Sequence, residues 1–443
     1  MLRSDSIAPK METEEASAWI AIKWKKAIKF VLKMQRRIVF AYKEGNTEKL
    51  NALNHLLINS FQAKALAVYL VTNSKGARTP GVDRVRWRTD EQKYNAVMDL
   101  IPERYQPQPY KLVYIPKDSG GFRKLNIPTM SDRAMQMLHK FALEPISECK
   151  ADPYSYAYRH WRSAHGALAE CRKLLKTGAM WVIEGDIKSC FDSISHDWLL
   201  KNVPLDNDIL TKFLKCGCIE GSRYIPSCGT GISQGSPISP VLCNLTLDGM
   251  CETLKQQNND LEIIRYADDF VVFSKNIKPL GDAITALNEF LEERGLSLSK
   301  EKTVISSVKK GFEFLGFFFQ NKNGFATVEP STKSVRKVLH AAKDKIIRYA
   351  EKEPTYLAEK LNPVLLGWAN YHKYVSSRTA FTYVDAMITH YLSTYGISRE
   401  VRSLITQISE VPVETYLGVP TEINPFEVHL NTLYEKWEYF WWY

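Results

Sequence analysis

The spacing of apolar and polar residues predicts helices at both ends of the chain and strands between them. From about Ala16 to Tyr69, apolar residues recur at helical intervals with Lys and Arg between them, which predicts helices with one basic face. Beyond Pro330 the spacing is helical again, and Arg336 and Lys337 belong to a basic stretch of this region. The C-terminal part therefore predicts a separate helical unit.

Two segments after the first helical region alternate apolar and polar residues like the strands of a hairpin. Tyr110–Pro116 is the first, residues 118–121 have the composition of a tight turn, and Phe122–Ile127 returns as the partner strand. Lys117 and Arg123 lie near the tip of this hairpin.

The middle of the chain contains a further strand and a second hairpin, each of which ends in acidic residues. Trp181–Asp186 is an apolar run that ends in a carboxylate. Glu262–Arg265 and Phe270–Phe273 are two more apolar runs, and Tyr266-Ala267-Asp268-Asp269 lies between them. Strands and helices interleaved with hairpins predict an α+β fold with an antiparallel sheet of ferredoxin-like type.

The aspartates at these strand ends are the candidate chemistry. An Asp-Asp pair such as Asp268 and Asp269 can simply reflect turn propensity. Here strongly apolar strands flank it, so the charge lies at the rim of a buried sheet, which is costly unless cations compensate. Together with Asp186 the pair offers the oxygen ligands that Mg²⁺ prefers. Nucleotidyl transfer uses two such ions, one at the attacking 3′ hydroxyl and one at the leaving pyrophosphate.

Length and composition are those of a globular protein with a polyanionic partner. The 443 residues exceed the usual size of one hydrophobic core, which predicts about two to four compact units. No apolar stretch approaches the roughly 18 residues of a membrane span, so we expect a soluble protein. The net charge of +10 favours a nucleic-acid partner through counterion release, although many basic proteins bind none.

The eight cysteines and the absence of a signal-peptide pattern predict reduced thiols in a cytosol-like compartment. Cys216, Cys218 and Cys228 lack a fourth ligand at zinc-finger spacing, so plain thiols are favoured over a zinc site. We expect a cytoplasmic protein in a bacterium, with association with the nucleoid as a variant of this.

The tetrad Tyr266-Ala267-Asp268-Asp269 resembles the signature of reverse transcriptases. Other blocks follow in the order that this family shows: Arg123–Thr129 with Asp132 and Arg133, Asp186–Lys188 with Phe191 and Asp192, Gly231–Pro240, Ser299–Thr303 and Phe314–Gly316. Within the family the chain is similar to the group II intron reverse transcriptase/maturase branch, on the residues Thr79–Asp83, Tyr158–Leu168 and Leu366–His372. The likeness covers roughly residues 19–375.

The resemblance implies a right-hand polymerase with fingers, a palm built on the ferredoxin-like sheet, a helical thumb and a helical N-terminal extension. The expected units are residues 1–75 for the extension, 76–170 for the fingers, 171–329 for the palm with part of the fingers, 330–376 for the thumb and 377–443 for a divergent C-terminal segment.

The resemblance also implies the roles of individual residues. The catalytic acids would be Asp186, Asp268 and Asp269, and these with Ile187 would bind two Mg²⁺ ions, Mn²⁺ being the alternative. The dNTP would be bound by Lys117, Arg123, Phe191 and Gln234, with Phe191 as an aromatic gate under the deoxyribose. The template–primer duplex would be bound by Gly235, Lys302, Arg336 and Lys337.

For several of these residues a plain structural role stays open. Phe191 could be a core residue, and Lys117 and Arg123 could be solvated hairpin charges. The aromatic residues Trp368 and Tyr371 of the thumb motif favour core packing over base stacking.

The resemblance weakens after the thumb motif. No Cys/His cluster of HNH endonuclease type follows it, so we expect no target-strand cleavage by this chain. Residues 378–443 lack a basic run, and the aromatic end Trp437–Tyr443 predicts packing or a partner surface, for a second copy or another protein. Gly231–Pro237 also differs from the commoner Thr-Pro-Gln-Gly-Gly form of its block.

Two functional hypotheses follow from these patterns. One is an intron-encoded RNA-directed DNA polymerase, with an RNA template, a DNA or RNA primer and dNTPs, that also binds structured intron RNA for splicing and retrohoming. The other is a domesticated relative that serves antiviral defence or DNA repair with another noncoding RNA. A non-enzymatic RNA chaperone is disfavoured because all three acids are present.

Overall fold

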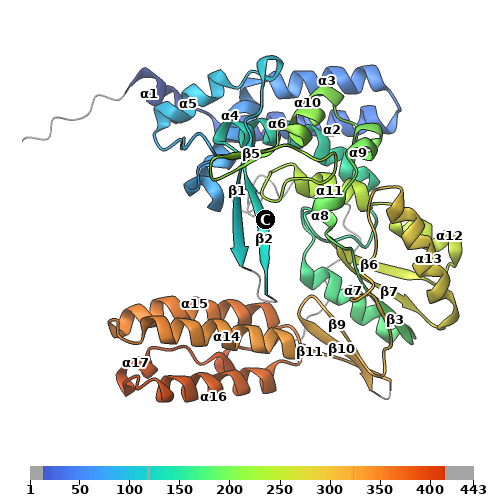
Figure 1. Cartoon of the computed structure of the whole chain (residues 1–443), viewed down its shortest axis with the longest axis vertical. Helices are drawn as coiled ribbons and strands as arrows, with labels where there is room; N and C mark the ends of the chain where they lie inside the picture. The colour runs from blue at the N-terminus through green and yellow to red at the C-terminus, as the bar shows by residue number, and fades with distance from the viewer. Residues whose placement is uncertain (1–12, 117–119, 323, 415–443) are drawn as a thin grey trace, which may run out of the picture.

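The computed structural model describes residues 13–116, 120–322 and 324–414 of the chain. The N-terminal helices lie at the top of Figure 1, a sheet with its covering helices on the right, and the C-terminal helices at the bottom. Among the described residues, no helix is both long enough and apolar enough to cross a membrane.

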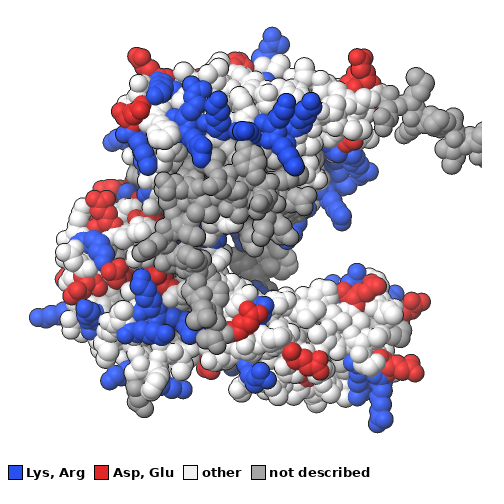
Figure 2. All heavy atoms as spheres, turned by 180° about the vertical axis from the view of Figure 1, so that it is seen from behind, with Lys and Arg blue, Asp and Glu red and all other residues white. Residues whose placement is uncertain are grey.

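Helices form the N-terminal part, as predicted: α1 (Glu14–Ile20), α2 (Trp24–Lys43), α3 (Thr47–Asn59), α4 (Phe61–Asn73), η1 (Lys75–Arg78), α5 (Asp90–Asp99), η2 (Pro102–Arg104) and α6 (Met130–Lys150). Helix α2 buries Val31 and Ile38 against its neighbours and exposes Lys26, Lys33 and Arg37. The predicted basic face is therefore confirmed. Figure 2 shows Lys and Arg side chains gathered over this upper part of the molecule.

The first predicted hairpin is confirmed as β1 (Tyr110–Pro116) and β2 (Phe122–Ile127), paired antiparallel. It belongs to a sheet of order β2-β1-β4-β5, completed by β4 (Cys218–Glu220) and β5 (Arg223–Ile225). Only the root of β1 pairs with β4, so the rest of the hairpin extends from the fingers toward the C-terminal helices (Figure 1). Lys117 lies outside the described residues.

The second sheet has the order β6-β7-β3-β8 and contains β3 (Trp181–Asp186), β6 (Glu262–Tyr266), β7 (Asp269–Ser274) and β8 (Val304–Ser307). All of its neighbouring strands are antiparallel. Helices separate β3 from β6 and β7 from β8, which is the ferredoxin-like succession that the sequence predicts. Strands β6 and β7 are apolar because both faces of this sheet are covered.

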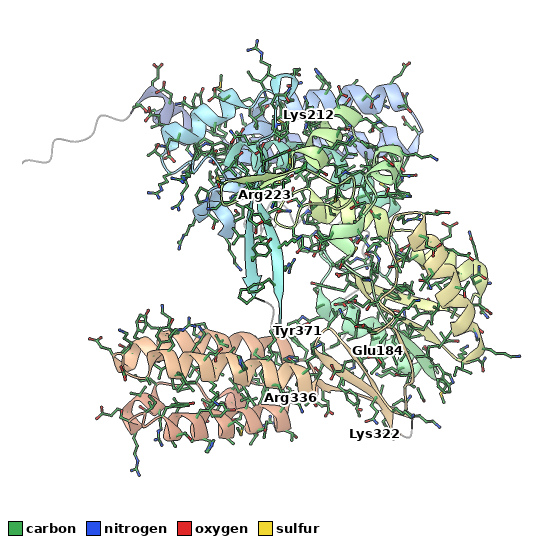
Figure 3. The ribbon with its side chains drawn as sticks, in the orientation of Figure 1. Glu184, Lys212, Arg223, Lys322, Arg336 and Tyr371 are labelled. Carbon is green, nitrogen blue, oxygen red and sulfur yellow. The ribbon has the colours of Figure 1, made fainter. Side chains whose placement is uncertain are left out.

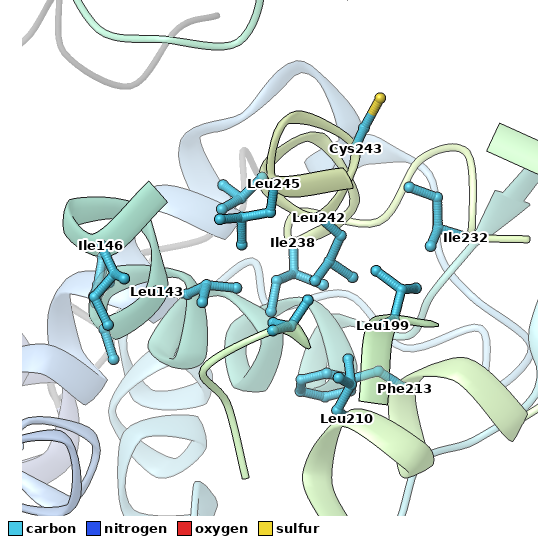
Figure 4. Close-up of a cluster of buried hydrophobic side chains, with 14 of the residues drawn as sticks. Leu143, Ile146, Leu199, Leu210, Phe213, Ile232, Ile238, Leu242, Cys243 and Leu245 are labelled. Carbon is cyan, nitrogen blue, oxygen red and sulfur yellow. The ribbon is translucent and has the colours of Figure 1, made fainter. Parts of the chain in front are cut away.

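The remaining helices before β8 are α7 (Ala164–Lys176), α8 (Cys190–Ser193), α9 (His196–Asn202), α10 (Asn207–Lys215), α11 (Ser239–Leu247), α12 (Met250–Gln257) and α13 (Lys278–Glu292). Helices α7, α12 and α13 lie beside the second sheet, called the palm sheet below, whereas α10 lies among the N-terminal helices (Figure 1). Leu143 of α6, Leu210 of α10 and Leu242 of α11 belong to one buried cluster (Figure 4). This core continues from Trp19 to Leu298, so the segments expected as extension, fingers and palm share one hydrophobic core.

A small sheet, β9 (Phe312–Phe314), β10 (Phe317–Lys322) and β11 (Phe325–Pro330), leads into the helical thumb. The thumb contains α14 (Thr332–Tyr349), α15 (Pro354–His372), α16 (Arg378–Thr394), α17 (Arg399–Ser403) and η3 (Ile408–Glu410). One core joins Leu339 of α14 with Ile388 of α16 and Ile408 of η3. The boundary expected at residue 376 therefore falls inside a single helical bundle.

Side chains at one end of α15 attach the thumb to the palm. Tyr371, labelled in Figure 3, donates its hydroxyl to the carbonyl oxygen of Leu315 at 2.9 Å, in the turn between β9 and β10. The ring Nε2 of His165, on α7, lies 2.8 Å from the carbonyl oxygen of Tyr371. Trp368 and Tyr371 pack against neighbouring rings, which agrees with the predicted packing role.

Candidate active site

The sheet register brings the predicted acids together. Asp186, the last residue of β3, lies directly opposite Asp269, the first residue of β7. Side chains of directly opposed residues share a face of the sheet, with Cβ atoms about 4.5–5.5 Å apart. Asp268 lies in the connection between β6 and β7, where Ala267 has the left-handed φ of 57°. The three carboxylates therefore share one edge of the palm sheet.

Gly185 leaves space, next to Asp186, for the side chain of Phe270 on the neighbouring strand. It lies opposite Phe270, and a Cβ atom at position 185 would come within 2.2 Å of the Phe270 ring. The Phe270 ring is buried over this glycine. Glycine is thus required here by close packing and not by its backbone conformation.

The electrostatics of this edge favour cations. Partial burial raises the pKa of Asp268, and the negative charge of Asp186 raises it further. Removal from solvent, followed by the charges of Asp268 and Asp186, raises the pKa of Asp269 to about 6. The ammonium Nζ of Lys302 lies 3.0 Å from Oδ2 of Asp186, and this hydrogen bond raises the pKa of Lys302.

The carboxylates fit Mg²⁺ by their chemistry, although they do not form a closed cage. In the described part of the chain, no three His, Cys, Asp or Glu side chains converge as a ready-made metal site. Mg²⁺ commonly takes only one or two protein carboxylates and completes its shell with waters and substrate phosphates. An open edge with Asp186 and Asp268 is therefore a suitable donor set for an ion that arrives with a nucleotide.

A cavity of about 1310 Å³ opens in front of the acids. Its lining includes Asp186 and Asp268 from the palm together with Arg123 and Gln234 from the fingers. Phe191 and Tyr158 also line it, as do Ile187 and Lys302. A space of this size is ample for a nucleotide. Asp269 and Gly235 are not among the lining residues.

The fingers residues in this cavity contact each other. Nε of Arg123 donates to Oε1 of Gln234 at 2.6 Å, and the backbone N–H of Asn126 donates to the carbonyl oxygen of Gln234 at 2.8 Å. Gly235 has a φ of 111°, and a Cβ atom there would lie 2.8 Å from the carbonyl oxygen of Asn126. The segment with Gln234 is therefore docked against β2.

Phe191 projects from α8 into the cavity and is fixed by backbone and ring contacts. The N–H of Ile232 donates to the carbonyl oxygen of Phe191 at 2.6 Å. The Phe191 ring meets the Tyr158 ring edge to face, with centroids 6.4 Å apart. Ile187, in contrast, buries its side chain in the core, which leaves its main-chain carbonyl as the only group with metal-ligand chemistry.

The expected template–primer residues do not lie together. Lys302 is beside the acids, whereas Arg336 and Lys337 are exposed on α14 of the thumb. Figure 3 labels Arg336 on the thumb and Glu184 on the palm strand that leads to Asp186. Any duplex held by both groups must extend from the acids to the thumb.

Arg265 is a buried cation behind the tetrad. The sequence motifs give this residue no role. Its side chain is fully enclosed, and Nη2 lies 2.5 Å from Oδ1 of Asp248. Nη1 lies 3.4 Å from Oδ1 of Asn244 and 3.5 Å from the carbonyl oxygen of Ala267. Arg265 thus supports the turn that carries Asp268. An Arg that directly follows Ile263-Ile264 in a predicted strand and directly precedes the tetrad is the signal that could have indicated it.

Three family models match the chain in succession. The model "N-terminal domain of reverse transcriptase" matches residues 19–100, and "Reverse transcriptase (RNA-dependent DNA polymerase)" matches residues 115–319. The model "Group II intron, maturase-specific domain" matches residues 335–403. Protein YkfC of Escherichia coli (strain K12) is 33% identical over 309 residues, which cover 59% of this chain and 81% of that protein. The chain belongs to the group II intron reverse transcriptase/maturase family.

A second relative, LtrA, agrees with this family. The group II intron-encoded protein LtrA of Lactococcus lactis subsp. cremoris is 27% identical over 360 residues, and the match covers 65% of this chain but only 60% of LtrA. A telomerase from Candida albicans, solved with a fragment of telomeric RNA, has a TM-score of 0.40 at 14% identity, with 69% of this chain and 62% of that chain covered. The matched model is that of an RNA-directed DNA polymerase, and Asp186, Asp268 and Asp269 lie within its span. The maturase match crosses the expected boundary at residue 376, as the shared thumb core does.

Proposed function

We propose that this chain extends a primer along an RNA template with dNTPs, and that Asp186 and Asp268 hold the catalytic metal ions. The observation that supports this most directly is the shared cavity. Asp186 and Asp268 of the palm line it together with Arg123 and Gln234 of the fingers. A nucleotide between them would have its phosphates near cations and carboxylates together, which is the arrangement that phosphoryl transfer needs.

The proposed metal is Mg²⁺, in two ions, with Mn²⁺ as a substitute. When bound, the ions would activate the primer 3′ hydroxyl and stabilise the leaving pyrophosphate. Asp186 and Asp268 would be the main ligands, with the carbonyl of Ile187 as a further oxygen. Asp269 lies outside the cavity lining and would act mainly through its charge.

The fingers would bind the nucleotide. The guanidinium of Arg123 has the forked geometry that suits phosphate oxygens, and its hydrogen bond to Gln234 orients it over the cavity. Lys117 is proposed for the same triphosphate. Phe191 would be the gate that leaves no space for a 2′ hydroxyl, since its ring lines the cavity that also contains the acids.

The duplex would be bound through its phosphates by cations on separate elements. Lys302 lies beside Asp186, where the primer 3′ end would be, and Arg336 with Lys337 would contact the backbone further along the duplex. Gly235 would pass close to the templating base pair because it carries no side chain. Such contacts are independent of sequence and weaken as salt rises.

We further propose that the natural RNA partner is a group II intron and that the chain promotes its splicing and retrohoming. The maturase-specific match at residues 335–403 and the likeness to LtrA support this assignment. An open reading frame inside intron RNA domains would agree with it. A gene outside any intron would favour the domesticated alternative.

The polymerase proposal is tested by primer extension on an RNA template with Mg²⁺ and dNTPs, comparing wild type with Asp268→Asn. We expect Asp268→Asn to lose extension by at least about 100-fold, since a metal ligand contributes several kcal/mol to the transition state. Asp260→Asn is the matched control, because Asp260 is exposed in the loop before β6. Equal extension by wild type and Asp268→Asn would refute the proposal.

A further inference from the structure

The loop between α6 and α7 contains a strained aromatic residue. Tyr158 has a φ of 58°, a left-handed conformation that is costly for a bulky side chain. Such strain persists only where the surroundings impose it, and it concentrates at functional sites. The groups around Tyr158 must therefore impose this conformation.

Buried partners hold the residues on both sides of Tyr158. Nδ2 of Asn244 donates to the carbonyl oxygen of Ala157 at 3.0 Å. The side chain of Arg159 donates to the carbonyl oxygens of Asp152 and Ser155, each at 2.8 Å, and is paired with Glu148 at 2.9 Å. These contacts fix the backbone on either side of position 158, so the ring is directed by the fold and not by a free loop.

The ring of Tyr158 points into the nucleotide cavity. Tyr158 lines this cavity together with Asp268 and Phe191, and the residue is 43% exposed. Its ring and that of Phe191 meet edge to face at 77°. Partial burial raises the pKa of the Tyr158 hydroxyl to about 12, and the nearby Asp268 adds to this, so the phenol is neutral. A neutral ring can press against a gate residue without placing charge beside the acids.

We propose that Tyr158 determines sugar selectivity by holding the Phe191 ring in place from the side. An aromatic gate excludes a 2′ hydroxyl only if its ring cannot move aside. Phe191 lies on the four-residue helix α8 and packs partly against the main core, and the Tyr158 ring adds an edge-to-face contact within the cavity that both rings line. Tyr158 is thus a positioning residue, and the inference rests on the proposed gate function of Phe191.

The test compares kcat/KM for one dNTP and the matching rNTP in single-nucleotide incorporation on an RNA template. Tyr158→Asn removes the ring but tolerates the left-handed backbone, since Asn adopts this conformation more readily than other residues. We expect it to raise relative rNTP use by about 3-fold to 10-fold, which is the range of one aromatic pair contact. Tyr158→Phe keeps the ring and should stay within about 2-fold of wild type.

Phe191→Ala and the double variant Phe191→Ala/Tyr158→Asn complete the set, with Tyr383→Ala, exposed on α16, as the control for loss of a tyrosine ring. Because Tyr158 acts through Phe191, the double variant should discriminate no worse than Phe191→Ala alone. Unchanged selectivity in Phe191→Ala would refute the gate itself. If Phe191→Ala relaxes selectivity but Tyr158→Asn does not, or if the two effects multiply, the role of Tyr158 is overturned.

Discussion

The two hairpins that carry the site residues differ in how the fold supports them. Strand β7 is paired on both sides, by β6 and β3, and Phe270 within it is only 1% exposed. The hairpin β1–β2 is paired with another strand only at its root, and Phe122 near its tip is 66% exposed. The acids thus lie on fully paired, buried strands. The proposed phosphate contacts belong instead to the hairpin β1–β2, called the arm below, which pairs with a third strand only at its root.

This difference in packing suits the two proposed tasks, metal binding by the acids and nucleotide binding by the hairpin β1–β2. Metal ligands must keep their spacing to within a fraction of an ångström, which a fully paired strand in a packed sheet provides. Cations that bind an incoming triphosphate must admit it and release pyrophosphate, and weakly packed segments are where such movement occurs. Arg123 is placed over the cavity by its side-chain hydrogen bond to Gln234, a contact that can form and break.

The strongest contrast should come from matched phenylalanine truncations in the two hairpins. Phe270→Ala removes a buried ring that packs on Gly185 and should lower the free energy of unfolding by about 3–5 kcal/mol. Phe122→Ala removes an exposed ring and should change it by less than about 0.5 kcal/mol. Urea denaturation measures both. Equal losses would show that the arm is as firmly packed as the palm hairpin.

A change of similar size is expected when the support behind the palm tetrad is removed. Arg265→Met leaves Asp248 as an unpaired buried charge, which costs about 3–5 kcal/mol. Lys255→Met, on the partly exposed pair with Glu262, should cost less than about 1 kcal/mol. Denaturation and primer extension should be measured together. If both variants behave alike, Arg265 does not support the acidic turn.

Acid should weaken the root of the fingers hairpin through His139. The imidazole is buried beside Phe213, whose carbonyl oxygen accepts from Tyr110 of β1, and burial lowers the pKa of His139 to about 4. The unfolded chain takes up the proton below about pH 6.5 and the folded chain does not. Stability from this group is therefore complete above pH 6.5 and falls by about 1.4 kcal/mol per unit toward pH 4.

The measurement is the difference in unfolding free energy between pH 7 and pH 5 for wild type and His139→Leu. The variant should lose about 2 kcal/mol less than wild type over this range, from the same pKa difference. His340→Leu, an exposed histidine on α14, is the control and should follow wild type. Parallel pH curves for wild type and His139→Leu would contradict the assignment.

The smallest expected effect is a rise in the KM for dNTP, caused by a substitution on the arm that leaves the free energy of unfolding unchanged. Arg123→Lys loses the forked guanidinium and its hydrogen bond to Gln234, so the KM for dNTP should rise about 10-fold with little change in the unfolding free energy. Lys124→Arg is the control, because side chains of neighbouring strand residues point to opposite faces. An unchanged KM in Arg123→Lys would remove this residue from the nucleotide site.

Much of this arrangement follows from local patterns. The alternating segment Tyr110–Pro116 and the apolar runs Trp181–Asp186 and Glu262–Arg265 predict strands that the structure contains with nearly the same bounds. Residue 376, the expected end of the thumb, lies within a bundle in which α16 packs on α14. Helical periodicity identifies an apolar face but not the helix that covers it.

The sequence by itself determined the elements, the family and the acidic tetrad, because strand alternation, turn chemistry and the ordered blocks are properties of residues close together in the chain. Only the tertiary structure decided that Arg265 is neutralised by Asp248 and that Tyr158 is held in a left-handed conformation beside Phe191. Those roles depend on partners distant in the sequence. The role of a buried charge or of a strained residue can be inferred only from the groups that contact it.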